Sequence, residues 1–233
     1  MRPLNEFIGE GNVSSQAGQD GVLAEIMRRL KVEHGSCLEF GAGDGIRNSN
    51  TYQFYRRGWD CAYIEAGNHY PQLVENTPDA RHCQKLITCE PGDTLDDAIA
   101  QMGIPQDLTL MSLDIDSIDY WVWKSLKSRQ PLVVCIEYNS NFEPDEHRTV
   151  AYEIGLRWRN DDRYYGASAG ALYALAIQKG YVLVAFLPGN DLIFLRADVY
   201  TAHQDRFDEL PVTQVVKTPL HRDRTGRRMV EPT

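Results

Sequence analysis

The residues Cys37-Leu38-Glu39-Phe40-Gly41-Ala42-Gly43-Asp44-Gly45 carry the strongest fold signal in this chain. A short apolar run ends there at an acidic residue, and three glycines follow at alternate positions. Glycine adopts positive φ and lets a ligand approach the backbone where a Cβ would collide. In α/β sheets, a glycine turn between a strand and a helix N-terminus often cradles a nucleotide-like ligand. The stretch therefore predicts a ligand-binding turn, although a turn without a ligand can have the same pattern.

Apolar runs and helical periods alternate along the rest of the chain. Strands are expected at 36–40, 60–64, 82–88, 108–113 and 132–136, and helices at 22–30, 52–57, 69–76, 94–102, 120–128 and 169–178. Two last strands, 181–187 and 192–196, flank Pro188-Gly189-Asn190-Asp191, which is strong turn chemistry for an antiparallel hairpin. Together they predict an α/β fold: a doubly wound, mostly parallel sheet with a C-terminal antiparallel hairpin.

The length of 233 residues suits one domain with small additions. We assign an N-terminal arm to 1–13, the folded domain to 14–200 and a tail to 201–233. Ser14, Ser15 and Asp20 are expected caps of the first helix. Residues 140–166 show no period, which favours a lid or binding loop. The arginines of the tail lie beyond the last apolar run and predict a solvated segment: Arg222, Arg224, Arg227 and Arg228.

Composition excludes several classes of protein. The net charge of −9 argues against a nucleic-acid partner, which needs clustered basic residues. The five cysteines are odd in number and form no CxxC pair, which favours a reducing compartment without structural zinc. No run approaches the roughly 18 apolar residues that span a bilayer, and no signal-peptide pattern opens the chain. We expect a cytoplasmic protein with no membrane partner.

Acidic and amide side chains follow three of the expected strands. Glu65 ends the second strand, Asp114 and Asp116 follow the fourth, and Glu137 and Asn139 follow the fifth. Ligands of open α/β sheets lie outside the carboxyl ends of the strands, where an acid about 20 residues past the glycine turn binds ribose hydroxyls. Glu65 fits that position. The alternative is an exposed carboxylate at the end of a strand.

Two sets of residues could assist chemistry at these strand ends. Hard oxygen ligands suit Mg²⁺ or Ca²⁺, and the set comprises Asp114, Asp116, Glu137 and Asn139. In the alternative, Asp116 and Asp119 cap the next helix and Glu137 binds substrate directly. A metal-free base could instead be His147 or His69, because histidine titrates near neutrality. For His147, the position in the loop favours an exposed histidine without a role. Aromatic side chains could form the wall of an acceptor pocket or pack in the core: Trp121, Trp123, Tyr164 and Tyr165.

At this level of detail the chain resembles S-adenosylmethionine (SAM)-dependent methyltransferases of the FkbM-like kind, in the class I Rossmann-like superfamily. The matching stretches run from about residue 14 to residue 198: Ser15-Gln16, Gly18, Asp20-Gly21, Glu39 to Gly45, Ser49-Asn50-Thr51, Gly58-Trp59, Ile64-Glu65, Asp114-Ile115-Asp116, Asp119 to Trp123, Ile136 to Asn139 and Tyr165 to Ser168. The chain departs from the family at Ser117-Ile118, where Gly-Asn is expected, and at His147. Both departures lie on the presumed acceptor side.

The resemblance implies that 14–200 is a methyltransferase domain that binds SAM. Glu65 would bind the ribose hydroxyls, Asp93 the adenine amino group and Asp114 the methionine ammonium. Further cofactor-binding residues surround the glycine turn: Gln16, Glu39, Gly41, Gly43, Asn50 and Thr51. Of these, Glu39, Gly41 and Gly43 would receive the methionine end of SAM.

Methyl transfer from SAM is an in-line displacement at a sulfonium methyl, so the protein mainly positions the acceptor and removes its proton. The candidates for these roles are Asp116, Glu137 and His147, and Mg²⁺ could assist them. The expected acceptor is a small molecule or saccharide, methylated at oxygen. A nicotinamide oxidoreductase would need G-x-G-x-x-G, and Ile46 stands where the last glycine would fall. A binding protein without turnover would keep the same cofactor residues.

Overall fold

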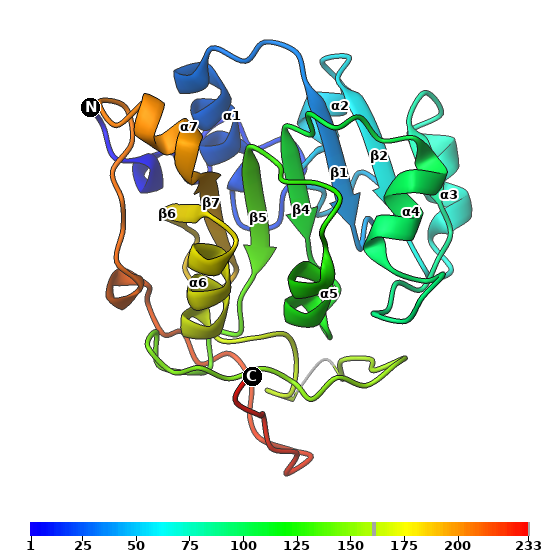
Figure 1. The fold of residues 1–233 in the computed structure, drawn as a ribbon, viewed down its shortest axis with the longest axis vertical. Coiled ribbons are helices and arrows are strands. Elements are labelled where there is room, and N and C mark those ends of the chain that lie inside the picture. Colours follow the sequence, from blue (N-terminus) through cyan, green and yellow to red (C-terminus); the bar gives the residue numbers. More distant parts are fainter. Residues whose placement is uncertain (160–161, 233) are drawn as a thin grey trace.

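The computed structural model describes residues 1–159 and 162–232, which build a seven-stranded sheet between two layers of helices (Figure 1). The strands are β1 (Ser36–Phe40), β2 (Asp60–Ile64), β3 (Arg81–Cys83), β4 (Leu110–Leu113), β5 (Val133–Glu137), β6 (Tyr181–Phe186) and β7 (Asp191–Arg196). Their order in the sheet is β3-β2-β1-β4-β5-β7-β6. Six strands run in the same direction, and β7 runs opposite to them, antiparallel to β5 and to β6. The predicted sheet and its C-terminal hairpin are confirmed.

Each face of the sheet has its own hydrophobic core. One core packs under α4 (Leu95–Met102), α5 (Asp119–Ser125) and α6 (Ala169–Gln178). The other lies under α1 (Gln19–Leu30), α2 (Tyr52–Tyr55) and α3 (Tyr70–Asn76). The remaining helices are α7 (Ala197–Ala202) and the short 3₁₀ turns η1 (Leu4–Phe7) and η2 (Val212–Gln214). Within the part of the chain that is described, every helix is too short or too polar to cross a bilayer.

Parallel pairing brings the carboxyl ends of four strands to the same edge of the sheet. Strands β1, β2, β4 and β5 run the same way, so their carboxyl ends meet there. Residue Asp191 starts β7 at the same edge, directly opposite Glu137. The segment after β5 and the end of the chain both cross this edge, below the arrowheads in Figure 1.

Two elements end three or more residues earlier than the sequence predicts, and each has a local cause. Strand β3 ends at Cys83 because it is an edge strand that pairs only with β2, and residues 84–88 turn toward the carboxyl edge instead. Helix α5 ends at Ser125 because the backbone N–H groups of Lys127 and Ser128 donate to the carboxylate of Asp96. If the helix continued, the N–H groups of Lys127 and Ser128 would instead donate to backbone carbonyls four residues earlier.

Only one of the three expected caps of α1 contacts its first turn. The helix begins at Gln19 after Gly18, and the Ser15 hydroxyl accepts a hydrogen bond from the backbone N–H of Asp20 at 3.1 Å. The Asp20 carboxylate instead accepts hydrogen bonds from the backbone N–H groups of Val13, Ser14 and Ser15. It therefore closes the preceding turn and fixes where the N-terminal segment meets the domain.

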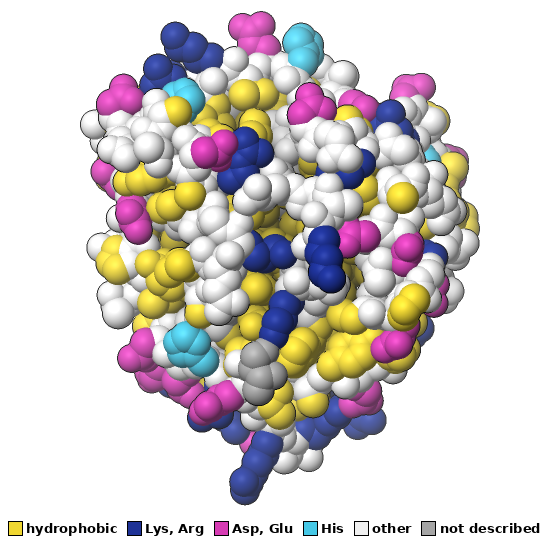
Figure 2. Space-filling view, in the orientation of Figure 1, with side chains coloured by type: hydrophobic (Ala, Val, Ile, Leu, Met, Phe, Trp, Pro, Cys, Tyr) yellow, Lys and Arg dark blue, Asp and Glu magenta, His cyan; other side chains and the backbone are white. Residues whose placement is uncertain are grey.

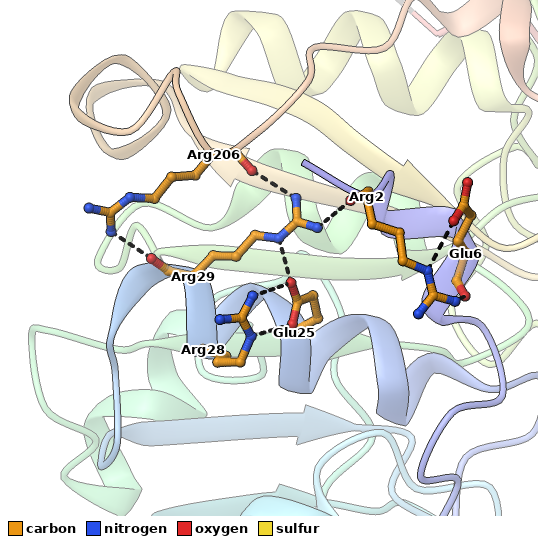
Figure 3. A network of polar contacts seen from close by, with 6 residues as sticks. All are labelled: Arg2, Glu6, Glu25, Arg28, Arg29 and Arg206. Atoms are coloured by element: carbon orange, nitrogen blue, oxygen red, sulfur yellow. Dashed lines mark hydrogen bonds and ion pairs between the residues drawn. The ribbon is translucent and has the colours of Figure 1, made fainter.

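Helix α1 also anchors distant parts of the chain through Arg29 (Figure 3). The guanidinium of Arg29 bonds the Glu25 carboxylate at 2.7 Å and donates to the backbone carbonyls of Arg2 and Arg206. The side chain of Arg29 is only 2% exposed, whereas that of Arg28, which also pairs with Glu25, is 67% exposed. Arg29 thus ties the arm and the start of the C-terminal region to one buried charge pair.

The end of the chain is not a free tail. We call residues 140–166 the long loop (described except at 160 and 161) and residues 216–232 the C-terminal segment. Thr218 N–H donates to the carbonyl of Ser140, and the Asn141 side-chain oxygen accepts from two backbone N–H groups of the segment. Thr149 pairs with Val230 farther along. The tail arginines are exposed, as the sequence predicts, but their backbone is fastened to the long loop.

Candidate cofactor cleft and acidic cluster

A cavity of about 340 Å³ opens at the carboxyl edge. It lies where the order of the strands reverses, between β1 and β4, the position at which open α/β sheets bind ligands. Four of the residues that the sequence predicts as site residues line it: Gly41, Glu65, Asp114 and Asp116. They come from three different strands, and the parallel register brings them together.

The carboxylate of Glu65 is held by two backbone groups. The N–H of Gly43 donates to its Oε2 at 2.9 Å, and the N–H of Gly67 donates to its Oε1. Each carboxylate oxygen has a second lone pair, which remains able to accept a hydrogen bond. Glu65 therefore presents two oriented acceptor atoms to the cavity, a geometry suited to a pair of neighbouring hydroxyls.

Gly41 sets the distance between the glycine turn and the end of β4. Its φ is +82°, and a Cβ at this position would lie 1.8 Å from the carbonyl oxygen of Asp114. No side chain fits there. At Gly43, by contrast, a Cβ would have nothing within 4 Å. Glycine at position 41 thus allows the turn and Asp114 to share one cavity.

Glu39 lies beneath the glycine turn and does not line the cavity. Its carboxylate is buried and accepts hydrogen bonds from the Ser49 hydroxyl, the Asn50 backbone N–H and the Thr51 hydroxyl. Burial raises the pKa of Glu39, and the hydrogen bonds from Ser49 and Thr51 oppose the rise. Glu39, Asn50 and Thr51 form a polar support under the turn that leads from β1 to α2.

Three carboxyl groups form a compact acidic cluster. Oxygen atoms of Asp114, Asp116 and Glu137 all lie within 4.8 Å of one another. Asp116 has a φ of +55°, a left-handed conformation that Asp and Asn adopt more readily than most residues. We refer to Asp114, Asp116 and Glu137 as the acidic cluster.

The environment of the acidic cluster favours bound protons. Burial raises the pKa of Asp116 to about 6, with a further rise from the charge of Asp119 and an opposing effect from a hydrogen bond with Glu137. The pKa values of Asp114 and Glu137 are raised well above their ordinary range, first by burial and then by neighbouring carboxylates. Like charges this close cannot all ionise near neutral pH. The cluster must hold a proton or a cation.

Asp119 and Asp191 are two further buried carboxylates near the acidic cluster, and no sequence pattern indicated Asp191 as a site residue. Asp119 accepts hydrogen bonds of 2.9 Å from the backbone N–H groups of Ile115 and Ser117, which fixes the turn after β4. Asp191 was missed. It receives a hydrogen bond from the Gln19 amide, and burial raises its pKa to about 6. Only the pairing of β5 with β7 reveals that Asp191 stands beside Glu137.

Asn139 does not join the acidic cluster. Its amide nitrogen donates at 2.8 Å to the carbonyls of Arg163 and Tyr165, and its side-chain oxygen accepts from Asn141. Both ends of the amide therefore brace the long loop.

Three other predicted site residues lie outside the cavity. Asp93 pairs with Lys85 at 3.2 Å, and the side chains of Gln16 and His147 are exposed. The segment that contains Gln16 does reach the glycine turn, because the Ser14 hydroxyl donates to the carbonyl of Ser49. His147 belongs to a part of the long loop remote from the cavity lining.

The walls of the cavity include residues that the sequence did not single out. Leu86 and Ile87, in the irregular segment after β3, form an apolar side, and Arg157 and Trp158 of the long loop form another. Trp123 packs in the core instead, against Phe194. The long loop has no period, so no sequence signal marks Arg157 or Trp158 as lining residues.

The sheet, its C-terminal hairpin and a cleft at the strand switch point define the Rossmann-like fold of class I methyltransferases. No family model and no curated protein matches the chain. Solved structures do. A TehB-like SAM-dependent methyltransferase from Corynebacterium glutamicum is 12% identical with a TM-score of 0.43, over 74% of this chain and 87% of its own. A SAM-dependent methyltransferase from Aquifex aeolicus is 10% identical with a TM-score of 0.40, over 73% and 86%. These likenesses are too remote to assign an activity.

Proposed function

We propose that this chain is a SAM-dependent methyltransferase of the FkbM-like kind that methylates a hydroxylated small molecule, such as a saccharide, at oxygen. One observation carries the proposal. The glycine turn orients the Glu65 carboxylate in the same cavity that Asp114 enters from β4. A ribose diol and an ammonium group are the ligand features that such a pair of carboxylates binds.

The cofactor would lie along the cavity with its ribose at Glu65. The two oriented oxygens of Glu65 would accept hydrogen bonds from the ribose hydroxyls, and Leu86 and Ile87 offer apolar surface to the adenine. The methionine ammonium would pair with Asp114. An adjacent cation favours the ionised form, so binding would lower the raised pKa of Asp114.

The acceptor would meet the sulfonium methyl at the acidic cluster. An in-line displacement requires the acceptor oxygen to be aligned and to lose its proton. Asp116 is suited to take that proton, since its pKa of about 6 leaves it ionised and yet basic near neutral pH. Its hydrogen-bond partner Glu137 would hold the carboxyl in place.

The acidic cluster also fits a divalent cation. Its three carboxyl groups are hard ligands within reach of one centre, which is the donor set that Mg²⁺ prefers. Such an ion would offset the crowded negative charge, orient the acceptor oxygen and lower the pKa of its hydroxyl. Asn139, whose amide is engaged in the long loop, would not be among the ligands.

Calorimetric titration with S-adenosylhomocysteine tests the proposal. We expect saturable binding that Glu65→Gln weakens at least about tenfold, because charge-assisted hydrogen bonds to the ribose are lost. Glu75→Gln is the matched control, since Glu75 is exposed on α3. Absence of heat with the wild-type protein, or equal binding by the Glu65→Gln variant, would refute the assignment of the cleft.

A further inference from the structure

Beyond the cofactor cleft, a second cavity is lined by arginines. It has a volume of about 230 Å³ and lies where the long loop meets the C-terminal segment. Arg157 and Arg159 come from the long loop and Arg227 from the C-terminal segment, and Asp162 and Tyr164 complete the wall. We call this cavity the arginine groove. Lys and Arg side chains gather at the corresponding lower edge of Figure 2.

The arginine groove continues the cofactor cleft. Leu156 and Arg157 line both cavities, so a ligand could extend from one to the other without leaving the surface. Beyond Arg227 a third cavity of about 300 Å³ carries three more arginines: Arg148, Arg163 and Arg228. The two cavities therefore form one continuous depression. The acidic cluster lies at its negative end and the arginine groove at its positive end.

Two guanidinium groups of the groove have no partner. Within the described parts of the chain, Arg157 and Arg159 make no ion pair and no side-chain hydrogen bond, and both are exposed. Arg227, in contrast, pairs with Glu153 and stacks on the ring of Tyr164, 4.2 Å from its centroid. Two uncommitted arginines two residues apart, beside a fixed third one, present donors that match a tetrahedral oxyanion.

Among the described residues that line the groove, the one carboxylate is already engaged. Asp162 is buried, and although burial opposes ionisation, hydrogen bonds from Thr225 and from backbone N–H groups lower its pKa. One of these donors is the N–H of Arg224. Asp162 therefore fastens the C-terminal segment, and the charge facing the groove remains positive.

We propose that the arginine groove binds a phosphate group of the acceptor, so that the substrate is a phosphorylated small molecule. The inference rests on the proposed function, because it assigns the acceptor of the same cleft. The phosphate would lie between Arg157 and Arg159, and the hydroxyl to be methylated would extend past Leu156 to the acidic cluster. Bidentate pairing with a phosphate is a role in which arginine is preferred.

An RNA strand is the competing source of phosphate. The net charge of −9 disfavours it, since a polymer requires many basic contacts along its path. A single phosphate requires only the two or three guanidinium groups that the groove supplies. The affinity for an RNA strand falls steeply with salt, whereas the affinity for a single phosphate falls less. The test therefore includes RNA binding at a fixed salt concentration.

The test is calorimetry of the full chain with inorganic phosphate, before and after saturation with S-adenosylhomocysteine. We expect phosphate to bind in both states, because Arg159 and Arg227 line the groove and not the cofactor cleft. Arg159→Gln should weaken phosphate binding at least about tenfold and leave S-adenosylhomocysteine binding within about twofold, because Arg159 lines the groove and not the cofactor cleft. Arg56→Gln removes the same charge from an exposed site elsewhere and should change neither.

A second measurement uses labelled SAM and a metabolite extract. Transfer of label should fall when the extract is first treated with alkaline phosphatase. The inference is overturned if phosphate does not bind, if the groove variant binds it normally, if acetate binds as well as phosphate, or if phosphatase leaves transfer unchanged. Arginine-dependent binding of a labelled 12-nucleotide RNA at 150 mM salt would overturn it in favour of a polymer. If S-adenosylhomocysteine fails to bind, the proposed function falls, and the acceptor assignment falls with it.

Discussion

At the residue scale, Asp116 combines a left-handed backbone with a carboxyl group that is crowded by other acids. Its pKa is raised to about 6, first by burial and then by the charge of Asp119. A carboxyl whose pKa is higher in the folded than in the unfolded state stabilises the fold most at low pH. That contribution declines as the pH rises from about 4 through about 6, when the folded protein must ionise a crowded group.

Asp116→Asn should therefore stabilise the protein at pH 8 while abolishing methyl transfer. Asn accepts the same left-handed conformation and removes the crowded charge, so we expect about 1–3 kcal/mol, or about 2–8 °C in Tm. At pH 4 the two proteins should melt together. Thermal melts at both pH values, with exposed Asp79→Asn as the control, provide the comparison. An unchanged or lower Tm at pH 8 would show that the cluster is not strained by charge.

At the scale of an element, α1 is positioned by Arg29 more than by its own capping. The first turn of the helix has one side-chain contact, from the Asp20 N–H to the Ser15 hydroxyl, whereas its last turns carry a buried guanidinium with three partners. Arg28 and Arg29 contact the same carboxylate, Glu25, from different environments. Hydrogen bonds from Arg28 and, to a smaller extent, Arg29 lower the pKa of Glu25 to about 2 against the effect of burial.

Arg29→Ala should lower the free energy of unfolding by about 3–5 kcal/mol, because it leaves buried acceptors unpaired. Arg28→Ala should cost no more than about 1 kcal/mol, since that pair is exposed to solvent on the arginine side. Urea denaturation of both variants measures the difference. Similar losses in the two variants would mean that burial of the pair contributes nothing to the anchoring of α1.

At the scale of the whole molecule, the wall of the cavities at the carboxyl edge depends on the C-terminal segment. The long loop supplies Arg157 and Trp158. It has no regular structure of its own, and it is held in place by hydrogen bonds from the C-terminal segment together with those from Asn139 and Trp121. Loops with few internal contacts open at low free-energy cost when their external contacts are removed.

Removal of residues 217–233 should therefore leave the sheet folded and expose the long loop to trypsin. We expect cleavage at the loop arginines at least about tenfold faster than in the full chain, with a circular dichroism spectrum that retains its helical signal. Removal of 231–233 alone is the control, because it keeps the pairing of Thr149 with Val230. Equal cleavage rates in all three proteins would contradict a supporting role for the C-terminal segment.

Local patterns alone predicted the sheet and part of the lining of the cavity at its carboxyl edge. Strand β1, the glycine turn and the hairpin between β6 and β7 were readable because apolar periods and turn residues act over a few neighbouring positions. The strand-end carboxylates Glu65, Asp114 and Asp116 followed, since parallel strands must deliver their carboxyl ends to one edge.

Contacts between distant segments decided the rest. The pairing of β5 with β7 placed Asp191 beside Glu137, and the bonds of Asn139 to the long loop removed it from the acidic cluster. The raised pKa of Asp116 and the position of Arg157 in two adjoining cavities also arise only from the folded arrangement. Burial, electrostatic coupling and hydrogen-bond pairing depend on distances in space between residues far apart along the chain, and no local pattern encodes those distances.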